Sequence, residues 1–122
     1  MTARKQLEVQ LRKLIPKAWR LIAYQDSLDA ISNVTVMLKQ ESITKAPFAP
    51  QGAHLVTYTV TLIDPATDPK KAELALDENV NDLLYKLDTV EWIMWSRAEK
   101  VQFAEFNMAY DISLEVITRK AI

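Results

Sequence analysis

The chain lacks the residues on which several common functional sites depend. It contains no cysteine, one glycine (Gly52) and one histidine (His54) in 122 residues. Without cysteine it has no disulfide and no thiolate ligand for a metal. One glycine is too few for the phosphate-binding loops of nucleotide-binding proteins, because several glycines bring the backbone of those loops close to the anion. One histidine excludes a three-histidine zinc site, and we expect neither a cofactor, a metal centre nor catalytic residues.

Long apolar runs and a strong excess of one charge are also missing. No segment approaches the ~18 apolar residues that a membrane span needs, and the start of the chain does not resemble the apolar core of a signal peptide. The formal net charge is -1, whereas a broadly basic nucleic-acid-binding domain would carry a positive excess. With 49% hydrophobic and 25% charged residues, the composition predicts one soluble globular domain over residues 1–122.

Hydrophobic periodicity divides the chain into two helices and five strands. Apolar residues at helical spacing predict a first helix from Thr2, as N-cap, to about Leu14. A second helix is predicted from Pro69, behind the N-cap Asp68, to about Leu87. Alternating and β-branched residues predict strands over 19–24, 34–44, 54–63, 92–103 and 108–119. The order α-β-β-β-α-β-β predicts an α+β fold, in which two main helices pack on one face of a mostly antiparallel sheet of about five strands.

The second predicted helix carries apolar residues on two faces. Its core stripe is expected to comprise Ala72, Leu76, Val80, Leu83, Leu84 and Leu87. Leu74 and Tyr85 lie off this stripe, and their spacing returns to nearly the same side of the helix about 16 Å further along. They are either scattered surface residues, which are normal in globular proteins, or a contact with a neighbouring subunit.

Two further apolar segments have no obvious covering element. The strand that begins at Trp92 is apolar on both sides over 92–95, although a sheet covered on one face should alternate. Either more of this chain covers its second face, as in a central strand buried at one end, or a partner does, and tryptophan is enriched at interface hot spots. The loop 45–53 carries Phe48 between two prolines. Phe48 either inserts into a partner or folds back over the sheet edge.

The charges are distributed unevenly along the chain. The first helix and the residues after it carry six cations offset nearby only by Glu8, namely Arg4, Lys5, Arg12, Lys13, Lys17 and Arg20. They form either a solvated helix face or a surface for a phosphate backbone or an acidic protein. The second helix carries four acids, namely Glu73, Asp77, Glu78 and Asp82. This asymmetry suits either head-to-tail contacts between copies or ordinary solubility.

Three other titratable residues receive structural interpretations. His54 has no second histidine to complete a site, so we interpret it as structural or incidental. Asp64 and Asp68 flank a proline-containing turn. A carboxylate pair could serve acid–base chemistry, but turn formation and helix capping explain these two residues better.

The order of elements and several local stretches resemble the tail terminator proteins of long-tailed bacteriophages, especially those of actinobacterial phages. The resemblance spans nearly the whole chain and consists of packing and turn patterns. The stretches that carry it are Thr35–Met37, Val60–Pro65, Ala75–Asp77, Trp95–Val101 and Ala109–Ile112.

The resemblance implies a structural virion protein without catalytic residues that caps the finished tail tube as a ring, usually of six copies. Such a ring ends tube growth and offers the surface to which the head connector docks. The implied partners are other copies of the chain, the tail tube protein and the connector proteins, while genome DNA passes through the lumen without specific binding. The implied location is the tail–neck junction of the virion, after assembly in the host cytoplasm. We expect Phe48 to face the tube or a neighbour, and Leu74, Tyr85, Trp92 and Trp95 to lie in subunit contacts.

Three other functions are compatible with the sequence. A head-completion or connector-adaptor protein of the phage neck shares the small size and the ring-forming habit. A small dimeric α+β enzyme or ligand-binding domain needs a pocket with convergent polar groups, for which the sequence offers no clustered candidates. A nucleic-acid-binding module would use the basic first helix and would hold DNA in a salt-sensitive way.

Overall fold

The computed structural model describes residues 2–25, 31–46, 52–105 and 107–119. The predicted element order and the α+β class are confirmed, with two helices and a five-stranded, mostly antiparallel sheet. The elements are α1 (Ala3–Leu14), β1 (Arg20–Ile22), β2 (Thr35–Lys45), β3 (Ala53–Ile63), α2 (Pro69–Leu87), β4 (Ile93–Phe103) and β5 (Asn107–Arg119).

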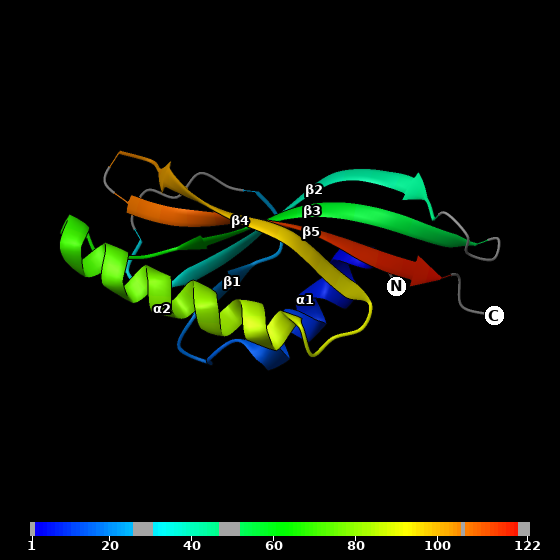
Figure 1. Cartoon of the computed structure of the whole chain (residues 1–122), viewed down its shortest axis with the longest axis horizontal. Helices are drawn as coiled ribbons and strands as arrows, with labels where there is room; N and C mark the ends of the chain where they lie inside the picture. Colours follow the sequence, from blue (N-terminus) through cyan, green and yellow to red (C-terminus); the bar gives the residue numbers. More distant parts are fainter. Residues whose placement is uncertain (1, 26–30, 47–51, 106, 120–122) are drawn as a thin grey trace.

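The strands lie in the order β1-β2-β3-β5-β4, so the sheet consists of two antiparallel hairpins joined through β3 and β5 (Figure 1). β1 runs parallel to β2 and pairs only with Thr35–Met37. β1 is shorter than the predicted strand 19–24, because only Arg20–Ile22 pair with β2. The rest of β2 on one side of the sheet, and β4 on the other, have edges that no described strand covers.

Both of these outer strands contain an irregularity in their pairing. The register shifts between Gln40 and Ser42 in β2, and between Trp95 and Arg97 in β4. Bulges on edge strands twist the exposed backbone groups away from an incoming strand. The two open edges are therefore poorly suited to continuous pairing with the edge of another sheet.

Helix α1 forms as its sequence predicts. The Thr2 side chain accepts a hydrogen bond from the Lys5 backbone N–H at 3.1 Å, which caps the first turn. Leu7 and Leu11, one turn apart, are fully buried against the sheet and α2. Pro16 follows the last turn and cannot continue the helix.

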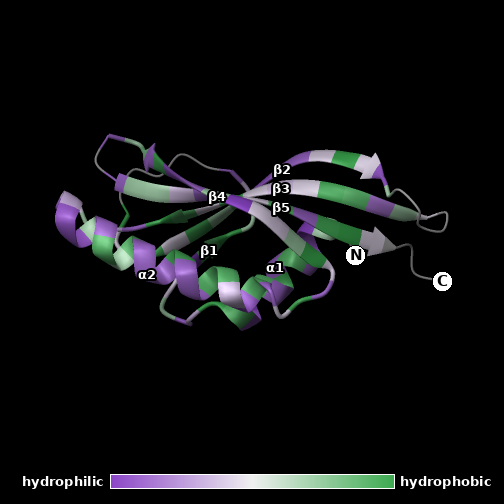
Figure 2. Ribbon diagram, viewed as in Figure 1, coloured by the Kyte–Doolittle hydropathy of each residue, from purple (hydrophilic) through white to green (hydrophobic). Residues whose placement is uncertain are grey.

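Helix α2 buries the predicted stripe. Asp68 is at the N-cap position and Pro69 at the first helical position, but the Asp68 side chain makes no capping hydrogen bond. Leu84 is half-buried and packs against the core. Hydrophobic and hydrophilic residues alternate along α2 in Figure 2, as expected of an amphipathic helix. Among the described residues no helix is both long and apolar enough to cross a membrane. The fully or nearly fully buried members of the stripe are Ala72, Leu76, Val80, Leu83 and Leu87.

The main core lies between the two helices and one face of the sheet. The predicted alternation is confirmed, because one set of alternating residues in β3 and β5 is buried beneath the helices while their neighbours point to the other face. Tyr58 is fully buried in this core, and its hydroxyl donates a 2.7 Å hydrogen bond to Gln40 Oε1. The core residues of β3 and β5 are Val56, Tyr58, Val60, Leu62, Ile112, Leu114 and Val116.

A second, smaller apolar cluster lies on the opposite face of the sheet. It contains Ile22, Met37, Ile63 and Ala109, which come from β1, β2, β3 and β5 and lie near one end of the sheet. The helices therefore cover one face completely enough to form a core. The other face is left to a small apolar cluster and the polar residues described below.

Candidate interaction surface

The outer side of α2 carries Leu74 and Tyr85, whose exposed fractions are 64% and 67%. These are the two most exposed large apolar side chains among the described residues. Helical spacing places Glu78 and Asn81 on the same stripe between them, so the stripe is apolar at its two ends and polar in the middle. The periodicity was sufficient to place Leu74 and Tyr85 off the core, and their contact with a subunit stays a prediction.

At the start of β4 the apolar run is divided between the core and the surface. Ile93 is buried, Trp92 and Trp95 are half-buried and pack against the core, and Met94 is 42% exposed. The interpretation of this segment as a central strand is wrong, because β4 is at the edge of the sheet. An edge strand can leave more of its side chains exposed than a central strand. Trp92 and Trp95 pack against the margin of the main core.

Trp95 also fixes the end of α2 against β4. Its indole Nε1–H donates a 2.8 Å hydrogen bond to Asp88 Oδ1, directly after the last turn of α2. Asp88 is three residues beyond Tyr85, a spacing that makes the two neighbours on a helix surface. Tyr85, Trp95 and the end of α2 therefore belong to one part of the surface, whereas Leu74 lies near the start of the helix.

An ion-pair cluster joins α2 to β4 and β5 further along. Lys100 Nζ lies 3.0 Å from Asp77 Oδ1 and 3.1 Å from Glu73 Oε1, and the Tyr110 hydroxyl donates to Asp77 Oδ1 at 3.1 Å. Hydrogen bonding to Lys100 lowers the pKa of Asp77, and hydrogen bonding to Asp77 raises the pKa of Lys100. Because Lys100 meets the first half of α2 and Trp95 meets its end, β4 and α2 run side by side in opposite directions.

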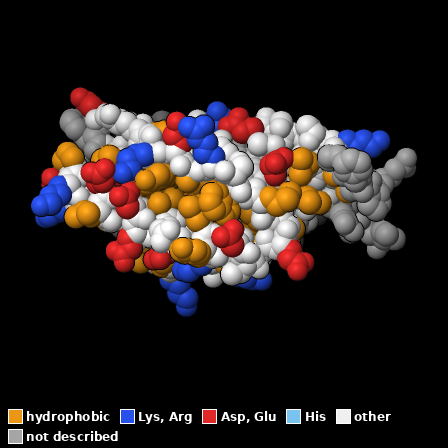
Figure 3. Space-filling view, viewed as in Figure 1, with side chains coloured by type: hydrophobic (Ala, Val, Ile, Leu, Met, Phe, Trp, Pro, Cys, Tyr) orange, Lys and Arg blue, Asp and Glu red, His pale blue; other side chains and the backbone are white. Residues whose placement is uncertain are grey.

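The molecular surface reflects this arrangement. In Figure 3, hydrophobic side chains gather in a band along the face where α2 and β4 lie, with acidic and basic side chains around it. The exposed apolar side chains of α2 are Leu74 and Tyr85, and Trp92 and Trp95 at the start of β4 are half-buried. Exposed apolar side chains surrounded by polar groups are typical of a protein–protein contact.

The sheet face away from the helices is mainly polar, which the sequence analysis had not identified as a surface of interest. Thr61 Oγ1 donates to Asp111 Oδ1 at 2.7 Å, and Thr59 Oγ1 donates to Glu41 Oε1 at 3.0 Å. These hydrogen bonds join neighbouring strands through their side chains. The alternation of threonine with buried residues in β3 was the available signal for this face.

The basic residues in α1 and directly after it lie at the surface. Arg4 Nη1 donates a 3.0 Å hydrogen bond to the Ala23 carbonyl and so ties α1 to the residues after β1. Lys5 Nζ lies 3.8 Å from Glu8 Oε1, one turn further along the helix. The other cations of this segment are exposed, and none of them has an ion pair among the described residues: Arg12, Lys13, Lys17 and Arg20.

The remaining candidate residues are separate from this surface. Asp64 is buried and accepts a 2.8 Å hydrogen bond from the Ala66 N–H, which confirms its predicted role in the turn. His54 is exposed near the start of β3. Phe48 lies outside the described residues. Among the residues that the structure describes, no group of three or more histidine and carboxylate side chains is placed to hold a metal ion.

No known protein-family model matches the chain, and no curated protein matches it in sequence. What the described part of the chain offers is an apolar side bounded by α2 and β4, a polar open sheet face and a basic helix.

Proposed function

We propose that this protein is a non-catalytic structural subunit of a bacteriophage tail, the terminator that caps the tail tube as a ring. The ring, of six copies in the resembling family, ends tube growth and forms the joint to the head connector. The observation that carries the proposal is the exposure of Leu74 and Tyr85 on the outer side of α2, with Tyr85 at the end of the helix that meets Trp95 of β4. Removing these apolar side chains from water in a contact with a neighbouring subunit would lower the free energy of the assembly.

A closed ring requires each subunit to present two different surfaces, because a cyclic contact other than a two-fold one is head-to-tail. The apolar side bounded by α2 and β4 is one candidate surface. The side that carries α1 differs from it in charge, with four exposed cations free of ion pairs among the described residues. This difference supports a heterologous contact over a contact between identical patches.

The proposed partners are further copies of this chain, the tail tube protein and the head connector proteins. We assign Leu74, Tyr85, Trp92 and Trp95 to contacts between subunits, and loop 45–53 with Phe48 to the tube or a neighbour. The bulges in β2 and β4 support side-chain contacts rather than a continuous sheet between subunits. Genome DNA passes through the lumen without specific binding, and the protein is located at the tail–neck junction.

Electron microscopy of the purified protein in negative stain, over a concentration series, tests this function first. We expect closed rings with a central hole, formed either by the protein alone or on isolated tail tubes. A protein that stays monomeric or forms two-fold dimers, and that also fails to bind tail tubes, would contradict the proposal. Binding to filled heads but not to tubes would instead indicate a head-completion or connector-adaptor protein.

A further inference from the structure

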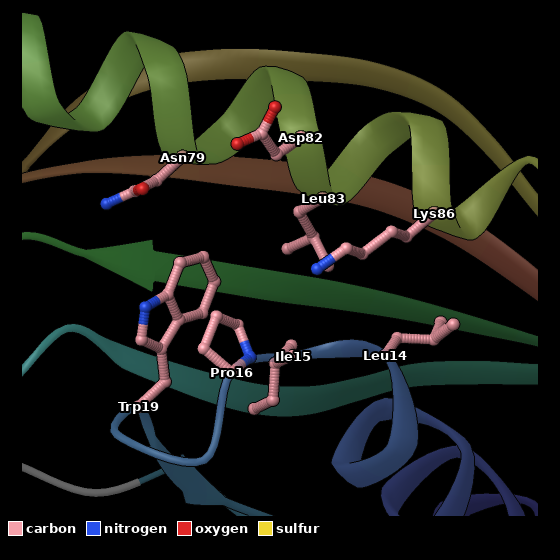
Figure 4. A pocket seen from close by; sticks show the side chains of 8 residues that line it. All are labelled: Leu14, Ile15, Pro16, Trp19, Asn79, Asp82, Leu83 and Lys86. Carbon is pink, nitrogen blue, oxygen red and sulfur yellow. The ribbon is translucent and has the colours of Figure 1, made fainter.

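A small groove lies between the end of α1 and the second half of α2. Figure 4 shows Trp19, Pro16 and Ile15 below the groove, with Leu83 and Lys86 reaching down from α2. Its volume is about 100 Å³. A cavity of about 150 Å³ holds a benzene ring, so this groove is of the size that one branched aliphatic side chain fills. The remaining lining residues are Leu14, Asn79 and Asp82.

The rim of the groove carries two charges in a fixed order along α2. Asp82 comes first and turns its carboxylate away from the groove, whereas Lys86, one turn later, extends over the groove toward Leu83 (Figure 4). Their spacing is that of a favourable helical ion pair, yet neither residue makes an ion pair with any described residue. Both charges are therefore available to a partner.

The outer side of α2 carries the complementary features. Leu74, 64% exposed, has Lys71 one turn before it and Glu78 one turn after it. Lys71 and Glu78 are also exposed and have no ion pair among the described residues. The order along the helix is cation, aliphatic side chain, anion. Along α2 beside the groove the order of the charged residues is the reverse, with the anion Asp82 first and the cation Lys86 second.

We propose that Leu74 of one copy inserts into the groove of the next copy, with Lys71 opposite Asp82 and Glu78 opposite Lys86. This contact rests on the proposed function, since it specifies how the subunits of the ring meet. The charge order permits only a parallel approach of the two α2 helices, because an antiparallel approach would set Lys71 against Lys86. The contact joins two different surfaces of the chain, so repeating it adds copies in one direction and closes a ring when the rotation allows.

The absence of cysteine from the chain makes site-directed cross-linking a direct test. The variant Lys71→Cys/Asp82→Cys carries one thiol on each side of the proposed contact. An ion pair between long side chains holds the backbones further apart than a disulfide permits, so a short bifunctional maleimide is the suitable reagent. On a denaturing gel we expect a ladder of dimers, trimers and larger species. The matched control Lys71→Cys/Glu91→Cys, with its second thiol at another exposed acid, should give no ladder.

A second variant tests the aliphatic side chain itself. Leu74→Asp should fold normally and weaken self-association at least about tenfold, because burying a leucine contributes roughly 1.5–3 kcal/mol and each 1.4 kcal/mol is tenfold. Tyr24→Asp, a similar change at another exposed apolar residue, should leave association unchanged. Sedimentation velocity over a concentration series measures both, and circular dichroism checks the fold.

The possible results separate this contact from the proposed function. Cross-linked dimers without larger species would overturn the head-to-tail contact in favour of a two-fold one. If microscopy shows rings but cross-linking gives no ladder, the contact is overturned and the ring is not. The same holds if Leu74→Asp forms rings at the same concentration as wild type. Neither rings nor cross-links, with tail tubes present or absent, would overturn both proposals.

Discussion

Lys100 Nζ lies 3.0 Å from Asp77 Oδ1, and this pair joins the outermost strand to the helix that covers the core. A 5.4 Å approach of the same Nζ to the centre of the Tyr110 ring, and a second ion pair to Glu73, make Lys100 the centre of the cluster. β4 is hydrogen-bonded to a neighbouring strand on one side only. Side-chain contacts to α2 therefore matter more for its position than they would for a central strand.

Replacing Lys100 by Met should lower stability slightly, and the loss should depend on pH. Partly exposed ion pairs contribute about 1 kcal/mol or less, so we expect the melting temperature at pH 7 to fall by at most a few degrees. The pKa of Asp77 is lowered below its ordinary value of 3.8. The stabilisation is therefore present above pH 3.8 and is lost as the pH falls through the lower pKa of the folded state.

Calorimetry of wild type and Lys100→Met from pH 2 to pH 8 measures this effect. Lys17→Met is the control, because Lys17 is exposed and has no ion pair among the described residues. The melting temperatures of wild type and Lys100→Met should converge at the acid end of this range. A difference between wild type and Lys100→Met that stays constant down to pH 2 would show that lost packing, rather than the ion pair, causes it.

Two leucines two residues apart on α2 should respond very differently to the same change. Leu76 is fully buried in the core and Leu74 is 64% exposed. Leu76→Ala leaves a cavity and should cost about 2–5 kcal/mol, whereas Leu74→Ala should change stability by about 0.5 kcal/mol or less. Urea unfolding at low protein concentration, where copies do not associate, measures both. Similar losses in the two variants would contradict the burial of the α2 stripe.

Local patterns in the sequence were sufficient to predict the elements and their inward faces. The stripe of α2 and the alternation in β3 and β5 depend on spacing between nearby residues, so the positions of Leu76, Val60 and Ile112 in the core could be predicted without the fold. The exposure of Leu74 and Tyr85 follows from the same periodicity. Asp64 was correctly placed in a turn because its proline neighbour makes the turn local.

Features that depend on which distant segments become neighbours could not be predicted. The insertion of β5 between β3 and β4 makes β4 an edge strand, and nothing in the spacing of Trp92–Trp95 reports this pairing. The contact of Lys100 with Asp77 and the groove beside Trp19 likewise require the packing of α2 on its neighbours. The assignment of Leu74, Tyr85, Trp92 and Trp95 to subunit contacts stays a prediction.

The hydrogen bond between Trp95 and Asp88 should couple the two residues energetically. Trp95→Phe keeps an aromatic ring but removes the N–H donor, and Asp88→Ala removes the acceptor of the 2.8 Å bond. Each should cost on the order of 1 kcal/mol, and the double variant should cost less than the sum of the two. Urea unfolding of the three variants and wild type completes the cycle. Strictly additive losses would mean that the bond contributes nothing to the stability of the folded chain.

The buried hydroxyl of Tyr58 should make stability sensitive to alkaline pH. Tyr58→Phe removes the 2.7 Å hydrogen bond to Gln40 Oε1 and should cost about 1 kcal/mol at pH 7. Burial raises the pKa of Tyr58 above its ordinary value of 10.0, an effect that the nearby Arg4 charge partly opposes. A raised pKa in the folded state means that stability is fully present below pH 10.0 and is lost as the pH rises through the folded pKa.

Phenylalanine cannot ionise, so Tyr58→Phe should escape that loss. The gap in unfolding free energy between wild type and Tyr58→Phe should therefore narrow as the pH rises above 10.0, while contributions from Lys100 and the other tyrosines cancel because both proteins contain them. Tyr85→Phe is the matched control, since the Tyr85 side chain is 67% exposed. Urea unfolding across this pH range gives the result. A gap that stays constant or widens would show that the Tyr58 hydroxyl remains in contact with water in the folded protein.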